Sequence, residues 1–219
     1  HSIVKLTIEQ KGFVHGSLIL DNAGYESTGK YQGTMYVSFS QLARLNDTLS
    51  ASITKDIGHH GDGHGSKQYA INYAVPDGNR MYRLSTYQYS YHQLVFMPEA
   101  FRSSGNTRGI EFSVEQVLNR TSRSKTAAVA KVIHKTRHSY IDDIEIGVQE
   151  QHTTALELGL SHRQYSGNTM SDIYLFYRQG IRGLGATVRS WEGVADNPTT
   201  LYKMAGLEGE VQSLSLIHI

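Results

Sequence analysis

A strict alternation of apolar and polar residues along most of the chain is the feature that most restricts its fold. In the segment 34–39, Met35, Val37 and Phe39 alternate with Thr, Tyr and Ser. A period of two places successive side chains on opposite faces of a β-strand. The same period recurs in the segments 48–54, 68–75, 110–115, 156–161 and 172–178, and no comparable stretch has a helical period. We therefore predict an all-β chain.

The stretch DNAGYESTGKYQG, residues 21–33, predicts how these strands are joined. It lies between two alternating segments, 14–20 and 34–39. Gly and Asn adopt positive φ at little cost, so Asn22, Gly24 and Gly29 favour a turn at this place. The whole unit is typical of a β-hairpin, and the chain repeats such a unit about five times.

The predicted connectors alternate between short and long. The short ones are 41–46, 76–79, 119–124 and 166–168, and the long ones are 21–30, 56–66, 92–106, 137–152 and 180–199. Outer-membrane barrels have tight turns at one membrane surface and long loops at the other. Most predicted strands are roughly 9–13 residues long, close to the ~9–11 of a tilted membrane strand and longer than the ~5–6 of a soluble one. The pattern favours an antiparallel, up-and-down transmembrane β-barrel over a soluble β-sandwich.

Composition narrows the function classes further. The chain has no cysteine, which excludes disulfides, Cys-based zinc sites and thiol nucleophiles. Its formal charge is +1 and its basic residues are scattered, so we expect no nucleic-acid partner. No apolar run approaches the ~18 residues that a transmembrane helix needs. This criterion does not apply to membrane-spanning β-strands, because only every second residue of such a strand faces lipid.

Charges inside the predicted strands indicate which face is wet. A Lys or Arg that faces lipid at the membrane midplane costs roughly 2–4 kcal/mol. Lys131 lies in the middle of a strand, so we expect it to face inward, with Ala128, Ala130 and Val132 toward lipid. By the same alternation, the predicted pore-lining residues are Gln68, Asn72, Glu111, Glu115, Lys131, Glu157, Asp172 and Arg178.

One tyrosine-rich strand is expected to contribute to an aromatic girdle. Arg83 directly follows a predicted turn, where exposure to the interface is cheap. We therefore expect Tyr87, Tyr89 and Tyr91, which share its face of the strand, to point outward toward lipid headgroups.

Three other patterns suggest chemistry but are explained more simply. The loop HHGDGH at 59–64 offers imidazole and carboxylate ligands, and Asp142, Asp143 and Glu145 offer oxygens for a hard cation. Neither has a recognisable spacing, so we interpret both as solvated loops and expect no metal and no cofactor. The strand glutamates suggest an acid–base pair, yet their polar faces suit a channel better, and no GxSxG motif marks a nucleophile. We do not expect an enzyme.

Several ordered motifs resemble one known family. The residues Asp21, Asn22, Gly24, Thr28 and Gly29 form a DNxGxxxTG pattern at the start of the predicted barrel. Further along come Asn46–Asp47 before a strand, a YxxPxG turn with Pro76 and Gly78, the segment HRQYSG at 162–167, and Tyr177, Gly180, Gly185 and Ala186. Together they resemble the transporter component of two-partner secretion (TpsB), the hemolysin activation/secretion proteins, over roughly residues 13–210.

The resemblance implies a domain plan. Family members have two periplasmic POTRA domains followed by a 16-stranded barrel. Residues 1–12 would end the preceding POTRA domain, and 13–210 would form about the first nine or ten strands of the barrel. Residues 211–219 are expected to be a non-native tail. The gating motif Val-Arg-Gly-aromatic and its Asp partner have no match in the chain.

The resemblance also implies a function. It predicts a monomer in the outer membrane of a Gram-negative bacterium, in contact with its lipids, that passes an unfolded partner exoprotein of hemolysin or adhesin type through its pore. The alternatives are another outer-membrane barrel (a small closed barrel, a porin or a barrel enzyme) and, less favoured, a soluble β-sandwich binding module.

Overall fold

The computed structural model describes residues 12–58, 63–97, 99–186 and 201–213. Ten antiparallel strands follow one another in a single sheet of order β1-β2-β3-β4-β5-β6-β7-β9-β10-β11, and the short β8 pairs with β7. Their bounds are β1 Val14–Asp21, β2 Gln32–Ser40, β3 Thr48–Asp56, β4 His64–Asp77, β5 Arg80–Met97, β6 Glu99–Arg120, β7 Ser124–Ile141, β8 Ile144–Glu145, β9 Gln151–Ser166, β10 Thr169–Ile181 and β11 Lys203–Ser213, with a 3-10 turn η1 at Gly147–Gln149. The predicted all-β, up-and-down class is confirmed.

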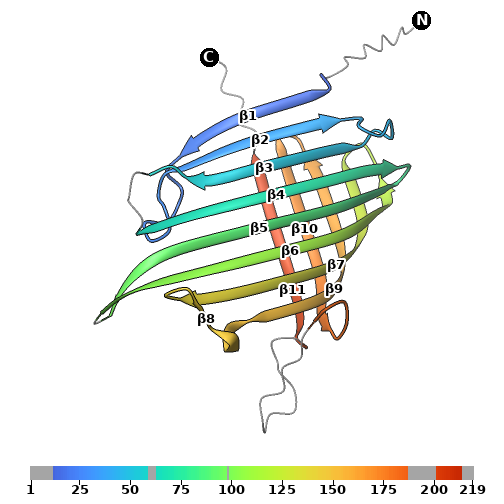
Figure 1. Ribbon diagram of the computed structural model, residues 1–219. Coiled ribbons are helices and arrows are strands. Elements are labelled where there is room, and N and C mark those ends of the chain that lie inside the picture. Colours follow the sequence, from blue (N-terminus) through green and yellow to red (C-terminus); the bar gives the residue numbers. More distant parts are fainter. Residues whose placement is uncertain (1–11, 59–62, 98, 187–200, 214–219) are drawn as a thin grey trace, which may run out of the picture.

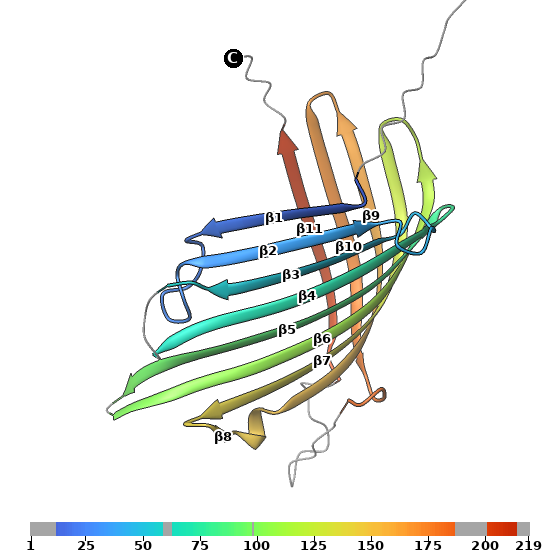
Figure 2. The same cartoon turned by 45° about the horizontal axis from the view of Figure 1, so that its top comes forward.

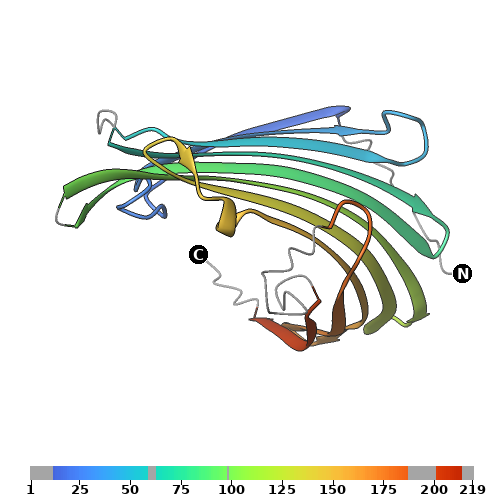
Figure 3. The ribbon, with the colours of Figure 1, turned by 60° about the horizontal axis from the view of Figure 1, so that its bottom comes forward.

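The sheet curls into an open trough with a convex and a concave face (Figures 1 and 2). Figure 3 shows the arc that the strands trace. In the described part of the chain, β1 pairs only with β2 and β11 only with β10, so the two outermost strands are not joined. No helix among the described residues is long and apolar enough to cross a membrane.

The convex face carries the apolar half of the alternating pattern. Cross-strand partners point to the same side of an antiparallel sheet, so the pairings Ala130–Leu158 and Leu158–Tyr177 align this face across β7, β9 and β10. Leu158 is 65% exposed and Leu175 54%. Within the described residues, the buried hydrophobic core consists only of Ala127, Ala155 and Phe176, and no second layer covers the apolar face. This arrangement does not support the β-sandwich alternative.

Several strands are longer than predicted, and two expected long connectors are wrong as loops. The segment 92–106 continues β5 and β6 as paired strands, with Met97 opposite Glu99. The segment 137–152 is shortened because β7 runs to Ile141 and β9 begins at Gln151. In sequence, the apolar residues Leu94–Met97 form a continuous run instead of alternating, and Pro98 and Gly105 are residue types common in loops. Pairing of β5 with β6 nevertheless satisfies the backbone groups of both strands here.

The end of the chain also differs from expectation. β11 continues to Ser213, which pairs with Thr169, so the boundary expected after Glu210 falls inside a strand. Val211 continues the apolar face and is 72% exposed. Residues 1–11 and 214–219, which include most of the two expected terminal segments, lie outside the described residues.

Candidate pore-lining surface

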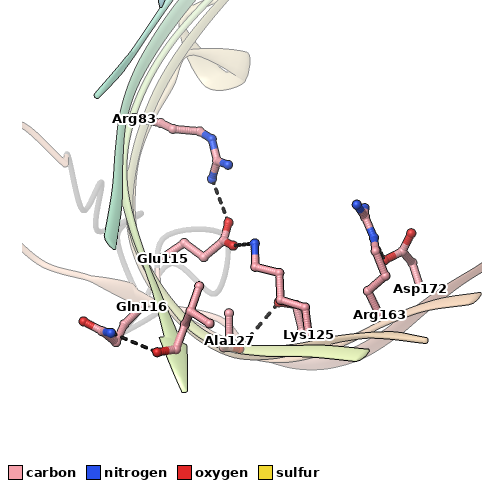
Figure 4. A network of polar contacts seen from close by, with 9 residues as sticks. Arg83, Glu115, Gln116, Lys125, Ala127, Arg163 and Asp172 are labelled. Carbon is pink, nitrogen blue, oxygen red and sulfur yellow. Dashed lines mark hydrogen bonds and ion pairs between the residues drawn. The ribbon is translucent and has the colours of Figure 1, made fainter. Parts of the chain in front are cut away.

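The eight predicted pore-lining residues all lie on one face of the sheet. Arg178 is opposite Glu157, Glu157 is opposite Lys131, and Lys131 is opposite Ser113 in β6, the strand whose alternate residues include Glu111 and Glu115. The alignment continues through Arg83 and Ala74, so Gln68 and Asn72 share this face too. It is the concave one, where Figure 4 shows Glu115 and Asp172. That these residues line a pore stays a prediction.

The most buried charged group in the strands of this surface is the carboxylate of Glu157, whose side chain has no exposure. Its Oε1 is 2.9 Å from Lys131 Nζ and accepts a 2.7 Å hydrogen bond from the Tyr174 hydroxyl. Its Oε2 is 2.5 Å from Arg178 Nη2 and 2.7 Å from Nε. Lys131 Nζ also lies 5.0 Å from the centroid of the Tyr174 ring. Each oxygen therefore has a cationic partner, as a buried carboxylate requires.

Two further ion-pair groups extend this surface toward the tight turns (Figure 4). The Glu115 carboxylate forms two ion pairs: its Oε2 is 3.0 Å from Arg83 Nη1, and its Oε1 is 2.6 Å from Lys125 Nζ. Arg163 Nε donates to Asp172 Oδ1 at 2.7 Å. Like Glu157, Glu115 is held between two cations from neighbouring strands, so the negative charges of these two carboxylates are neutralised within the wall itself.

The other half of the concave face is uncharged. The inward positions of β2 between 34 and 40, of β3 between 48 and 54, and of β4 between 66 and 74 carry hydroxyl, amide or methyl groups and one tyrosine. Thr34 and Thr54 share a 2.9 Å hydrogen bond between their hydroxyls. The described wall thus has a hydroxyl-rich half and an ion-paired half.

Tyr87, Tyr89 and Tyr91 lie on the concave face, so their predicted outward orientation is wrong. They share the face of Arg83, and Arg83 is turned inward by its ion pair with Glu115. The prediction treated Arg83 as an exposed interfacial residue, whereas its partner is 32 positions away in sequence. Tyr89 and Tyr91 stack on one another with ring centroids 6.0 Å apart.

A feature that sequence reasoning missed is that concave-face aromatic rings cover glycines of the adjacent strand. A Cβ added to Gly109 would lie 2.2 Å from the Tyr87 ring, and one at Gly159 would lie 2.6 Å from Tyr174. The same relation joins Gly105 to Tyr91, and Gly206 to Phe176. A ring that lies over a cross-strand glycine compensates for the missing side chain. The signal available in sequence was glycine inside a predicted strand, which indicates a close approach.

The first family motif shapes the turn between β1 and β2. Asp21 Oδ1 accepts the Ala23 N–H at 3.0 Å, and the Gly24 N–H donates to the Lys30 carbonyl at 3.1 Å. Gly29 has φ +113°, and a Cβ there would lie 2.2 Å from Asp56. Both observations explain why this position takes glycine. The neighbouring Thr28 N–H donates to the Tyr25 carbonyl at 3.2 Å.

The later motif residues are placed at strand ends and turns. Pro76 lies near the end of β4, and Gly78, with φ +55°, begins the two-residue turn to β5. Gly180 donates to the Tyr202 carbonyl at 2.8 Å, Gly185 has φ +86°, and the Ala186 N–H donates to the Gly183 carbonyl at 3.0 Å. Tyr177 instead lies on the convex face, opposite Leu158.

Asp47 organises the turn between β2 and β3, although the prediction noted it only as part of a motif. Its side chain is fully buried and accepts the backbone N–H groups of Ala43, at 3.0 and 3.1 Å, and of Leu45 at 3.2 Å. The Tyr73 hydroxyl donates to it at 3.1 Å. Burial alone would raise the pKa of the Asp47 carboxyl, but these hydrogen bonds outweigh it and hold the pKa below its ordinary value.

Possible metal ligands gather in one place among the described residues. The donor atoms of His138, Glu150 and His152 lie within 4.8 Å of one another. His138 Nδ1 is 2.7 Å from a Glu145 oxygen, and His152 Nε2 is 3.0 Å from a Glu150 oxygen. Each imidazole therefore already has a carboxylate partner within the protein. Of the loops considered from sequence, 59–62 lies outside the described residues, and Asp142 accepts the Arg102 backbone N–H at 2.7 Å.

Comparisons with known proteins agree with this architecture. The family model described as haemolysin secretion/activation protein ShlB/FhaC/HecB matches residues 1–213. The outer membrane transporter CdiB-2 of Burkholderia pseudomallei (strain 1026b) is 30% identical over 89% of this chain and 33% of its own length. The hemolysin transporter protein HpmB of Proteus mirabilis is 23% identical over 84% of this chain and 33% of its own. The chain thus spans about a third of the length of these relatives.

Two solved structures share the fold. CdiB from Escherichia coli matches with a TM-score of 0.83 and 21% identity, over 93% of this chain and 38% of that chain. CdiB from Acinetobacter baumannii matches with a TM-score of 0.67 and 30% identity, over 77% of this chain and 32% of that chain. Given the match of the family model to residues 1–213, the chain belongs to the haemolysin secretion/activation family, ShlB/FhaC/HecB.

Proposed function

We propose that this chain is part of an outer-membrane transporter that secretes a partner exoprotein by two-partner secretion. The observation that carries the proposal is the division of a single sheet into an exposed apolar convex face and a polar concave face on which Glu157 and Glu115 are paired with cations of neighbouring strands. Such a division suits a strand wall between lipid and a wet channel. Relatives named outer membrane transporter and hemolysin transporter support the same role.

The orientation follows from the connectors. The tight turns 78–79, 121–123 and 167–168 all lie at one end of the sheet, and β5 and β6 extend farthest at the other. In outer-membrane barrels the tight turns face the periplasm. The end with Asp47 and Gly78 is therefore the periplasmic one in this proposal. The chain would enter its first strand from that side, where the preceding POTRA domain, expected to end in residues 1–12, would lie.

The proposed mechanism is passage of an unfolded chain along the wall, without chemistry on the cargo. Glu157 and Glu115 are each held between two cations, which leaves them unavailable as strong binding sites for a passing peptide. The hydroxyl-rich wall of β2–β4 offers weak, exchangeable hydrogen bonds instead. Neither a cofactor nor enzymatic catalysis is needed for this role. The proposal extends to a monomeric 16-stranded barrel of which these are the first ten strands, to its contact with outer-membrane lipids, and to cargo of hemolysin or adhesin type.

The experiment is deletion of the gene followed by complementation with the full-length protein. We expect the partner exoprotein to disappear from the culture medium on deletion and to return on complementation, measured by immunoblot of medium and cells. Normal export in the deletion strain would refute the transport role. The favoured alternative would then be another outer-membrane barrel, such as a porin. Ion conductance of the reconstituted protein that does not change when the exoprotein is added would support that alternative.

A further inference from the structure

Four cations are clustered on the convex face just beyond the edge of the apolar surface, at the end opposite the tight turns. They are Lys55 in β3, Lys67 in β4, and Arg102 and Arg108 in β6, and all four are exposed. In β4 the order along the convex face is Lys67, Tyr69, Ile71, and in β6 it is Arg102, Ser104, Asn106, Arg108, Ile110. This is the height at which the headgroups of the outer leaflet meet a barrel in the proposed orientation.

These cations have no carboxylate partner among the described residues. None of the four takes part in an ion pair there, and the convex positions of β3–β6 hold a single carboxylate, Asp77, at the opposite end of β4. The nearby Asp142 accepts the backbone N–H of Arg102. This contrasts with the concave face, where Glu115, Glu157 and Asp172 are each paired with at least one cation.

The arrangement includes a repulsion that the fold leaves uncompensated. Lys55 and Lys67 are direct cross-strand partners on the same face, and like charges in this position destabilise a sheet. Lys67 Nζ lies 4.7 Å from the centroid of the Tyr69 ring, which positions it above the apolar surface without neutralising it. An anion bound between the two ammonium groups would remove this cost.

A second observation points to a ligand with hydroxyl groups beside the anion. Asn106 lies in the same cross-strand row as Lys67, through Ser90, and its Oδ1 is buried without a hydrogen-bond partner. Buried amide oxygens are normally satisfied. A hollow of about 570 Å³ is lined by Asn106 together with Lys55, Lys67 and Arg102.

We propose that the convex ends of β3–β6 bind the phosphate groups of lipopolysaccharide, the anionic glycolipid of the outer leaflet, with Asn106 accepting a hydrogen bond from a sugar hydroxyl. The inference rests on the proposed outer-membrane orientation. Arg forks and Lys ammonium groups are the usual protein partners of phosphate. The apolar surface directly below them, from Tyr69 to Val75 in β4, would contact the acyl chains of the same molecule.

The test uses the full-length protein in neutral detergent, with affinity measured by native mass spectrometry and by the shift in thermal unfolding. The ligands are bis-phosphorylated lipid A, the same lipid after phosphatase treatment, and inorganic phosphate. Near an anionic lipid surface each Lys or Arg contributes about a fivefold change in affinity. We therefore expect Lys55→Gln/Lys67→Gln to weaken binding of phosphorylated lipid A about 25-fold, and addition of Arg102→Gln and Arg108→Gln to abolish its thermal shift.

The matched control removes four other exposed cations, Arg120, Arg123, Lys135 and Arg137, each changed to Gln, and should bind lipid A as the wild type does. The single variant Lys67→Gln, about fivefold weaker, keeps the test valid if the fourfold variant does not fold. Equal affinity for phosphorylated and dephosphorylated lipid A, equal protection by inorganic phosphate, or equal loss in the control would each overturn the proposal. Export of the partner exoprotein is assayed in strains that express the same variants. Selective binding of phosphorylated lipid A without export would contradict the proposed secretion role but not this site. Export without selectivity for phosphorylated lipid A would contradict this site but not the secretion role.

Discussion

Replacing Glu157 by Gln perturbs the centre of the ion-paired wall, and its cost can be worked from the contacts. The substitution keeps the volume of the side chain but leaves Lys131 and Arg178 as two cations around a neutral amide. Removing one partner of a buried ion pair costs ~3–5 kcal/mol, because the remaining charge is uncompensated. Lys131 and Arg178 keep 23% and 29% of their side-chain exposure, so water screens part of the repulsion. We therefore expect the lower end of that range, about 3 kcal/mol.

The assay is urea unfolding of the full-length protein in lipid vesicles, followed by tryptophan fluorescence. The control is Glu26→Gln, which removes an exposed ion pair with Lys30 and should change the free energy of unfolding by about 0–0.5 kcal/mol. Adding Lys131→Met to the Glu157→Gln variant should recover roughly 1–2 kcal/mol, because the two changes share one network. The reasoning is refuted if Glu157→Gln costs no more than the control, or if Lys131→Met adds its full cost.

Three more predictions concern positions that the structure singles out. Gly109→Ala should destabilise by roughly 1–3 kcal/mol, because its Cβ would meet the Tyr87 ring at 2.2 Å, and Tyr87→Ser in the same chain should recover part of the loss in the urea assay. Gly29→Ala should cost roughly 1–3 kcal/mol because of φ +113° and the Asp56 contact, whereas Gly16→Ala, with ordinary space, should be nearly neutral; equal effects would contradict the turn geometry. The pKa of Asp47 in the folded state lies below the ordinary value of an aspartic acid, so the stability that this carboxylate contributes is present above the ordinary pKa and is lost as pH falls through the folded-state pKa. Asp47→Asn should therefore flatten the acid limb of the stability–pH profile, and an unchanged limb would contradict the role of that carboxylate.

The strands themselves were predictable because alternation is a local property. The pattern around Met35–Phe39 and Leu156–Leu160 requires only that one face be apolar, and the observed strands follow it. The inward orientation of Lys131 was predictable for the same reason, since a mid-strand charge has few alternatives in lipid.

The partners of the charged residues were not predictable, because they depend on register between strands. Nothing near Arg83 in sequence indicates Glu115, and without that pair Tyr87 and its neighbours were assigned to the wrong face. The extension of β5 and β6 through 92–106 was missed because the apolar residues Leu94–Met97 form a continuous run there, without the alternation that identifies the other strands. Asp47 was noticed as a motif residue, but its burial depends on Tyr73, which reaches the turn from β4.

Contact of the convex face with lipid and of the concave face with water can be measured directly. The chain has no cysteine, so single cysteines can be placed at Leu158 and Leu160 on one face and at Ser161 and Gln68 on the other. Each is spin-labelled in the full-length protein in vesicles, and its collision rates with oxygen and with a water-soluble nickel complex are compared. Labels at Leu158 and Leu160 should collide mainly with oxygen, and labels at Ser161 and Gln68 mainly with nickel. The opposite order, or protection of the two leucine positions from both reagents, would contradict the account.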